Sequence, residues 1–226
     1  MKRLLLPALA FGLCSLSPGS SAAQTRNLLA EMQAIATALG VACEHCHVAP
    51  AGSDLPQPKK DIARQMMAMT RDLNARVQAA TGKPAAEATQ VTCATCHRGV
   101  PIPRPLGQVI AQTLREQGLD AAAAQYRDLR ARFYGRATYD FTEDELLNIA
   151  RPLASLRPDD AISLLELNIE FNPSSAKSYA LMGFAYTRKF DDESAIASLE
   201  KAVELDPANN EIQGQLTQLK MFRRKR

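Results

Sequence analysis

The chain has 226 residues, with 27 Lys and Arg against 24 Asp and Glu, which gives a formal net charge of +3. This length suits one large domain or two small ones. The small net charge and the lack of a basic stretch with interleaved aromatic residues argue against nucleic-acid binding. We therefore expect no nucleic-acid partner.

The first 23 residues have the pattern of a secretory signal peptide. A short basic start precedes the apolar run LLLPALAFGLCSL and a cluster of small residues. We expect cleavage between Ala23 and Gln24, which removes residues 1–23 and exports the mature protein to the periplasm. Cleavage also removes Cys14 and leaves four cysteines. No other stretch is apolar enough to span a bilayer, so we expect no transmembrane helix in the mature chain.

Two stretches between residues 24 and 105 have the apolar spacing of amphipathic helices. The first, NLLAEMQAIATALG, stops at Gly40. The second, DIARQMMAMTRDLNARV, begins at Asp61, which we expect to be its N-cap. In the second helix Met67 points away from the apolar face. The apolar faces consist of Leu28, Met32, Ile35 and Leu39 in the first helix and Ile62, Met66, Met69, Leu73 and Val77 in the second.

Each predicted helix is followed by a loop and a CxxCH motif, first CEHCH and then CATCH. All four cysteines expected in the mature chain lie in these motifs, and two of the three histidines of the chain close them. The cysteines and closing histidines are Cys43, Cys46, His47, Cys93, Cys96 and His97.

Closely spaced cysteines occur in zinc sites, in dithiol redox pairs and in covalently attached haem. Only haem attachment requires a histidine directly after the second cysteine, because the cysteines form thioethers with the haem vinyl groups and the histidine ligates the iron. Cys46 and Cys93 are also farther apart than zinc-binding pairs usually are, and a redox pair would follow a strand. The motifs therefore predict two covalently bound haem c groups.

Residues 24–105 contain no Trp, Phe or Tyr. A segment this short and this poor in aromatic residues buries little apolar surface by itself. Two porphyrins would supply large apolar surfaces for Met, Leu, Ile and Ala side chains. We therefore expect this segment to be unfolded without haem.

The second axial ligand of each iron decides between an electron carrier and an enzyme, because an iron with an open side binds small molecules. The remaining histidine, His45, lies inside the first motif, where it can hardly reach the opposite face of a haem. Methionine remains, and Met32 lies on the apolar face before the first motif. Met66 and Met69 lie on the corresponding face before the second. The competing interpretation is that these methionines only fill the core.

Gly99 to Gly107 contains three prolines and predicts a stiff connector. From Gln108 onward the sequence predicts helices without strands. The sequence thus indicates a mostly α protein. Its cytochrome domain, residues 24–105, consists of two helix–loop–CxxCH units, and residues 106–226 form an α-helical repeat domain.

The stretch from Tyr179 to Pro207 has the spacing of a tetratricopeptide (TPR) repeat, and Pro173 precedes Pro207 by 34 residues, the repeat period. The preceding stretch DDAISLLELNIEFNP fits the second half of another repeat, whose first half we expect Pro152 to interrupt. Further predicted elements are a diverged helix pair at residues 108–133 and a closing helix at residues 209–221.

The sequence around both motifs resembles the multihaem cytochrome subunit of photosynthetic reaction centres. The resemblance covers Asn27 to Pro105 and is carried by LGVACEHCH, PQPKKDIARQMMAMTRDLN and VTCATCHRG. In that family a methionine on the helix before each motif ligates most of the irons, which implies Met32 for the first haem and Met66, rather than Met69, for the second. The family subunit typically has four motifs, whereas this chain has two and adds the TPR-like region.

We therefore expect an exported dihaem c-type cytochrome that carries single electrons through two His/Met-ligated haems. Its partner would be a redox protein, either free or part of a membrane electron-transfer complex, docked by the TPR-like region. Lys59, Lys60 and Arg98 are candidates for neutralising haem propionates or guiding an acidic partner, unless they are only solvated charges. The alternatives are a haem enzyme, such as a peroxidase with one open iron, and a scaffold in which haem is structural.

Overall fold

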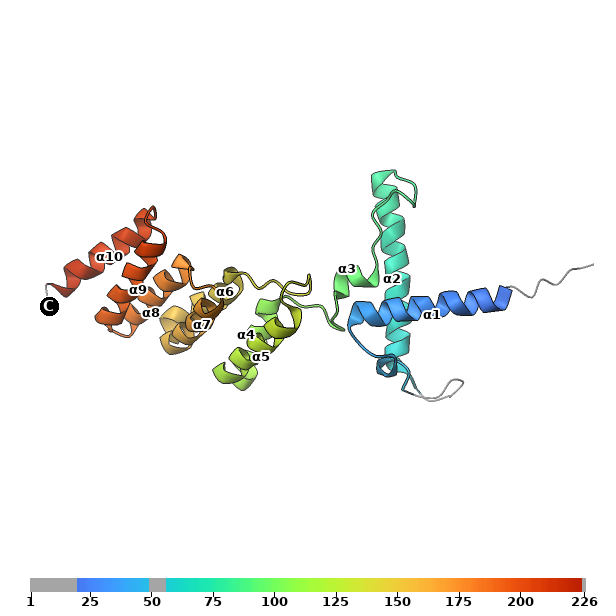
Figure 1. Cartoon of the computed structure of the whole chain (residues 1–226), viewed down its shortest axis with the longest axis horizontal. Helices are drawn as coiled ribbons and strands as arrows, with labels where there is room; N and C mark the ends of the chain where they lie inside the picture. The colour runs from blue at the N-terminus through green and yellow to red at the C-terminus, as the bar shows by residue number, and fades with distance from the viewer. Residues whose placement is uncertain (1–19, 49–55, 225–226) are drawn as a thin grey trace, which may run out of the picture. The chain divides into compact units, whose positions relative to one another are not determined.

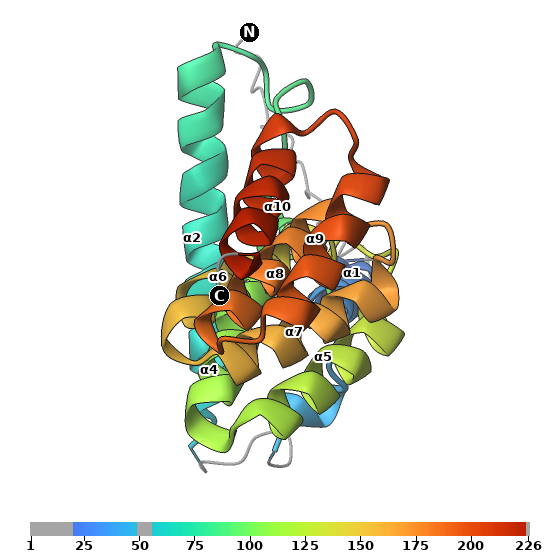
Figure 2. The same ribbon diagram turned by 90° about the vertical axis from the view of Figure 1, so that its left-hand side faces the viewer.

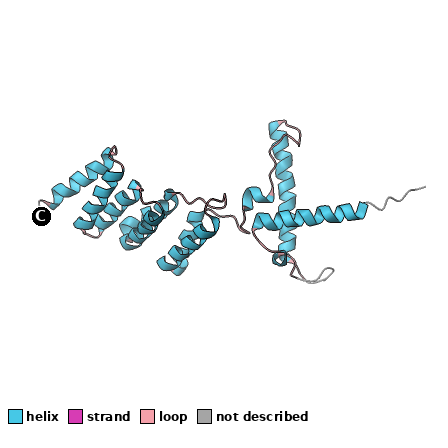
Figure 3. Ribbon diagram, viewed as in Figure 1, coloured by secondary structure: helices cyan, strands magenta, loops and turns pink. Residues whose placement is uncertain are grey.

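The computed structural model of the chain describes residues 20–48 and 56–224. Within these residues all regular secondary structure is helical, as predicted (Figure 3). The chain divides into two compact units, the first ending at Pro101 and the second beginning at Ile102. The predicted signal peptide lies outside the described residues except for residues 20–23, which begin the first helix. None of the described helices is both long and apolar enough to cross a bilayer.

The first unit carries both CxxCH motifs on short helical turns. In Figure 1 the two long helices, α1 and α2, cross, and α3 packs against α1. The elements of this unit are α1 (Ser20–Leu39), the 3₁₀ helix η1 (Cys43–His45), α2 (Pro58–Thr81) and α3 (Cys93–His97).

The ends of α1 and α2 follow the local chemistry of the chain. Gly40 ends α1 with a φ of +65°, a conformation that glycine adopts without strain, as predicted. The predicted start of α2 is wrong, because the helix begins at Pro58 and not after Asp61. Proline suits the first turn, where its missing N–H would have no helical partner. Asp61 lies in the first turn, where its carboxylate accepts a hydrogen bond from Arg64 at 2.6 Å.

The first unit buries very little of its own apolar surface. Among its described side chains only Ala38, Ala88 and Val100 are buried and apolar. The predicted apolar face of α2 is largely exposed, with Met66 at 38% and Met69 at 47% of full exposure. Ile62, Met66, Met69 and Leu73 lie on one side of α2, and we call them the apolar stripe of α2.

Backbone hydrogen bonds tie the end of the second motif to the end of α1. The Gly99 N–H donates to the carbonyl oxygen of Ala38 at 2.8 Å. Before the second motif, the side chain of Asn74 in α2 makes two hydrogen bonds to the backbone of Val91. It donates to the Val91 carbonyl oxygen at 2.9 Å and accepts from the Val91 N–H at 2.7 Å. The loop before the second motif is therefore held by α2, and the residues after the motif are held by α1.

The second unit is a stack of antiparallel helix pairs, seen from two directions in Figures 1 and 2. The pairs are α4 with α5, α6 with α7, and α8 with α9, and α10 packs against α9. This confirms the predicted TPR pair, the diverged helix pair and the closing helix. The bounds are α4 (Leu106–Gln117), α5 (Leu119–Phe133), α6 (Glu143–Leu156), α7 (Pro158–Phe171), α8 (Ala176–Arg188), α9 (Asp192–Leu205) and α10 (Asn210–Arg223).

The predicted interruption at Pro152 is wrong, because α6 continues through this residue. Proline lacks the N–H that would donate to the carbonyl oxygen of Asn148, four residues earlier. Ala150 and Ala154, on either side of Pro152, are fully buried. Packing of these two residues holds the helix where local propensity disfavours it.

Close packing and a buried polar network organise the second unit. A β-carbon on Gly183 would lie 2.8 Å from the Leu199 side chain, so α8 and α9 approach as closely as the sequence predicts. Every aromatic residue of the sequence after Phe11 lies in this unit, and Tyr126 is fully buried against Phe141 and Phe171. Asn168, also fully buried, donates hydrogen bonds to the Ser178 hydroxyl and to a carbonyl of α6.

Candidate haem-binding sites

The first motif and Met32 line the same cavity, which has a volume of about 380 Å³. Cys43, Cys46 and His47 line one part of it, and Met32 reaches it from α1. The structure therefore brings together the four residues that the sequence assigns to the first haem. Its other apolar lining residues are Leu28, Ile35, Ala36, Leu39, Val41, Ala42, Ala63 and Met67.

Two cations of α2 also line this first cavity. Lys60, a predicted propionate partner, lines it together with Arg64, one turn further along the helix. Arg64 was not singled out from the sequence, although its spacing of four residues from Lys60 places both on one helix face. Lys59 lies apart from the cavity, and its ammonium is 3.5 Å from Nδ1 of His45. These positions make Lys60 and Arg64 the cations best placed for carboxylates at this site.

The second motif is a single helical turn, which explains the spacing of its residues. Positions i, i+3 and i+4 of a helix share a face, so Cys93, Cys96 and His97 lie on one side of α3. The turn begins with a capping box, in which Thr95 accepts a hydrogen bond from the Thr92 N–H at 2.9 Å. The local sequence thus presents two thiols and an imidazole together.

The imidazole of His97 is oriented by the backbone that follows the motif. Its Nδ1 lies 3.0 Å from the carbonyl oxygen of Val100. Since a carbonyl only accepts, Nδ1 is the donor in this contact, which leaves Nε2 as the ring nitrogen available to a metal. Metal-ligating histidines commonly use their second nitrogen in this way, which fixes the tautomer and the ring orientation. Arg98, with a φ of +49°, allows the chain to turn so that this contact forms.

The second cavity, of about 490 Å³, lies beside Cys93 and is lined by Met67 of α2. Helical spacing predicts Met67 off the apolar face, and the resemblance to the reaction centre cytochrome subunit implies Met66 as the ligand. In the structure Met66 and Met69 belong to the exposed apolar stripe of α2 and do not line this cavity. Met66 and Met67 point in different directions because consecutive residues of an α-helix are rotated by about 100° around its axis. Met67 is therefore a second position from which a thioether reaches toward the motifs.

Ile35 and Met67 line both cavities. Ile35 comes from α1 and Met67 from α2, so the wall that the two cavities share contains one side chain from each crossing helix. No sequence pattern indicates this pairing, because it depends on where the helices cross.

The residues present fit covalent haem. The four described cysteines form no disulfide, and the thiols of Cys43 and Cys96 belong to exposed residues. Each motif has an adjacent cavity, although at the second motif only Cys93 and Ala94 line it and Cys96 and His97 do not. The unit also has few buried side chains of its own. The zinc alternative requires the two cysteine pairs to converge, and no such group of ligands occurs in the part of the chain that the structure describes.

The family model of the photosynthetic reaction centre cytochrome c subunit matches residues 20–146, more than half of the chain. The chain belongs to this family. As a member of the reaction centre cytochrome family, it is expected to bind haem c covalently and to transfer electrons. The family match continues past residue 105, the predicted end of the cytochrome domain, and includes α4 and α5.

Two further similarities agree with this assignment. The tetratricopeptide repeat model matches residues 176–209, which contain α8 and α9, and such repeats commonly bind other proteins. The chain is also 35% identical over 83 residues to cytochrome c-554 of Chloroflexus aurantiacus. This alignment covers 37% of the chain and 19% of the relative, so the chain matches about a fifth of that protein. Both the family and the repeat anticipated from the sequence are confirmed.

Proposed function

We propose that this protein is an exported dihaem electron carrier of the reaction centre cytochrome family. It would carry single electrons through two covalently bound haems, one at each motif, and dock a protein partner through its repeats. The observation that supports this most directly is the cavity in which Met32 meets Cys43, Cys46 and His47. It supports the proposal because the two cysteines that would form the thioethers, the histidine and the methionine line one cavity.

In this proposal the haems supply one-electron chemistry, and the chain holds and shields them. His47 and Met32 would hold the first iron, and His97 and Met66 would hold the second. Lys60 and Arg64 line the first cavity and would neutralise propionates there. Filling both axial positions with protein ligands keeps small molecules off the iron, which favours electron transfer over catalysis.

The wall shared by the two cavities supports electron exchange between the haems. Groups bound in the two cavities would be separated by Ile35 and Met67, which line both. A separation of only one layer of side chains suits an electron passing from one centre to the other. The external partner would be a redox protein of the periplasm, free or part of a membrane complex.

A second candidate function, a haem enzyme with one open iron position, is favoured by one observation. Met66 and Met69 are exposed and lie outside the cavity beside Cys93. If none of the α2 methionines, Met67 included, ligates the second iron, that iron would have an open side for peroxide or another small molecule.

Mass spectrometry and absorption spectroscopy of the protein purified from a periplasm test both candidates. The electron carrier predicts a chain beginning at Gln24 with the mass of two haems added, low-spin spectra and the red thioether-to-iron charge-transfer band. It also predicts no rapid cyanide binding. A high-spin ferric component that binds cyanide at one haem supports the enzyme. A product with the mass of the bare chain, or with zinc in place of iron, overturns both.

A further inference from the structure

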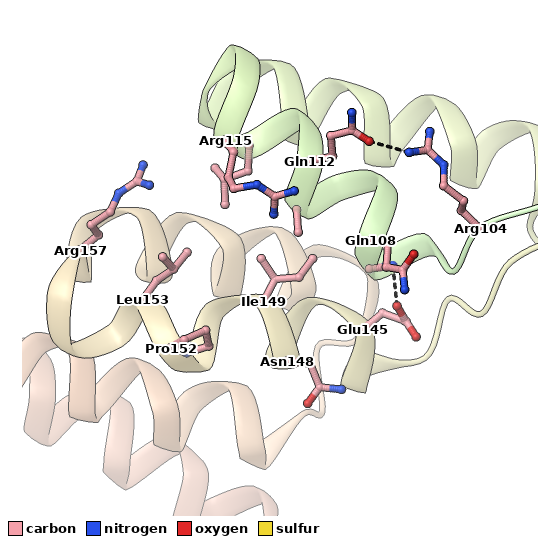
Figure 4. Close-up of a pocket in the computed structure, with 13 residues that line it drawn as sticks. Arg104, Gln108, Gln112, Arg115, Glu145, Asn148, Ile149, Pro152, Leu153 and Arg157 are labelled. Carbon is pink, nitrogen blue, oxygen red and sulfur yellow. Dashed lines mark hydrogen bonds between the residues drawn. The ribbon is translucent and has the colours of Figure 1, made fainter.

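The second unit contains a groove between α4 and α6 that neither haem requires. Its volume is about 630 Å³, larger than either cavity beside the motifs. Figure 4 shows the side chains of α4 on one side of it and those of α6 on the other. We call this space, between the first helices of two successive pairs, the α4–α6 groove.

The floor of the α4–α6 groove is apolar. Leu114 of α4 is buried, and Ile149 and Leu153 of α6 lie across from it with partly exposed side chains. Pro152 also lines the groove. Because proline has no N–H, the carbonyl oxygen of Asn148, another lining residue, lacks the helical donor four residues later. The floor is thus apolar surface beside a helical turn that lacks one backbone hydrogen bond.

Positive charge dominates the rim of the groove. Three arginines line it, Arg104, Arg115 and Arg157, against one acid, Glu145. The Glu145 carboxylate is already used, since it accepts a hydrogen bond from the Gly107 N–H at 2.7 Å in the first turn of α4.

The three arginines differ in how far their charge is compensated within the chain. Arg104 donates to the side-chain carbonyl of Gln112, a neutral partner, and Arg157 pairs with Asp160 outside the groove. The nearby Glu116 accepts from the other end of the Gln112 amide at 2.8 Å. Arg115 makes no ion pair in the described chain and is exposed, so its charge is the most available to a ligand.

These features fit an extended acidic peptide. Carboxylates pair with guanidinium groups in a two-pronged geometry, and an apolar side chain between them would cover Ile149 and Leu153. Amide side chains on the rim, such as Gln108, suit the N–H and carbonyl groups of a peptide backbone. The groove is lined by no aromatic residue among those described, so it lacks the stacking surface that single-stranded nucleic acids use.

We propose that the α4–α6 groove binds an acidic segment of a partner protein, with an apolar residue on the floor and carboxylates on Arg104, Arg115 and Arg157. This deepens the proposed docking function and depends on it. It also places the docking site at α4 and α6, within or next to the family match, and not at the TPR pair α8 and α9.

The test uses the full haem-loaded chain and a fluorescent twelve-residue peptide with two Leu flanked on both sides by Glu. We expect Arg115→Glu to weaken binding about tenfold or more, because it replaces an attraction by a repulsion. Arg115→Lys should lose less, since the charge remains. Arg151→Glu is the matched control, with the same charge change on an exposed residue of α6 that does not line the groove, and it should change affinity less than about twofold.

Two further measurements keep the outcomes distinct. Ile149→Ser should weaken the peptide with Leu but not an all-Glu peptide, because only the former covers the floor. The haem spectrum of each variant shows whether the electron-carrying unit is intact. If Arg115→Glu and Arg151→Glu weaken binding equally, or if Arg115→Glu affects only vesicles of anionic lipid, the groove proposal is wrong. Peptide binding that persists in Arg115→Glu but is lost on replacing α8 residues overturns the groove and leaves docking by the repeats in place.

Discussion

A β-carbon added to Gly40 would lie 2.1 Å from the carbonyl oxygen of Gly99. Gly40 precedes the first motif, and Gly99 follows the second. The backbone just before the first motif therefore contacts the backbone just after the second motif directly, with no room for a side chain between them. The adjacent hydrogen bond from Gly99 to Ala38 depends on the same close approach.

Gly40→Ala should destabilise the first unit much more than Gly82→Ala. Both glycines have a φ of +65°, so both substitutions bring the same backbone strain of about 1–2 kcal/mol. Gly82 has no atom within 4 Å of an added β-carbon, whereas Gly40 meets backbone that cannot rotate away. Thermal unfolding followed at the haem absorption band measures both. Equal losses would show that the approach of Gly40 to Gly99 does not stabilise the unit.

Met32→Ala should remove about half of the thioether-to-iron charge-transfer band, because one of the two irons loses its sulfur ligand. Met66→Ala should remove the other half, and Met69→Ala should leave the band unchanged. Met67 is the informative comparison, since it lines both cavities. If Met67→Ala removes half of the band and Met66→Ala does not, the second ligand is Met67.

Replacing all four motif cysteines by serine should leave the first unit unfolded and the second unit folded. Without haem the first unit has few buried apolar side chains, whereas the packing of α4 to α10 buries many apolar side chains. Hydrogen exchange measured by peptide mass should show rapid exchange across α1 and α2 and protection across α6 to α9. Protection of α1 and α2 in this variant would mean that the unit does not depend on haem for its core.

Asn168→Leu should destabilise the second unit by about 2–3 kcal/mol. The Asn168 amide donates to the Glu143 carbonyl at 3.0 Å and to the Ser178 hydroxyl at 2.8 Å, so it joins α6, α7 and α8. A leucine fills the space but leaves the buried Ser178 hydroxyl and the partly buried Glu143 carbonyl without this partner. Urea unfolding followed by tyrosine fluorescence measures the loss. Asn148→Leu, the same change at an exposed position, should cost little.

The stability of the second unit should fall in acid partly through Asp191. Hydrogen bonds from the Ser194 hydroxyl and backbone N–H lower the pKa of this carboxyl, which caps α9. A lowered folded pKa stabilises above the unfolded value of about 4, and this contribution is lost as the pH falls through the folded pKa. Asp191→Asn keeps a capping oxygen without the charge, so its unfolding midpoint should depend less on pH between 5 and 2. This range begins just above the unfolded pKa of about 4 and extends below it, because the folded pKa is lower. An unchanged pH dependence would contradict the assignment.

The helices and their order were predictable because their signals are local. Apolar residues recur at helical spacing in α1 and α2, and Gly40 and Pro207 mark helix ends through backbone geometry alone. The small residue Gly183 likewise predicted a close helix contact, because nothing larger fits there. The identity of the cofactor followed from a motif whose residues all lie on one helical turn.

The features that the sequence could not provide depend on contacts between distant segments. Pro152 was expected to break a helix, but packing of Ala150 and Ala154 outweighs the local penalty. Met67 appeared to point away because only the apolar stripe was considered, and the crossing with α1 places it between two cavities. The arginines of the α4–α6 groove are dispersed along the sequence and converge only when α4 packs beside α6.

Every tyrosine of the chain, and every phenylalanine apart from Phe11, follows Pro101 in the sequence, and there is no tryptophan. Phenol and indole rings are the side chains through which an oxidised centre most readily draws an electron from the surrounding protein. The first unit has none, so an oxidised haem bound there as proposed would have no tyrosine or tryptophan within its own unit to oxidise. With haem bound there as proposed, electrons would reach and leave the first unit through the haems themselves and not through oxidised aromatic side chains of that unit.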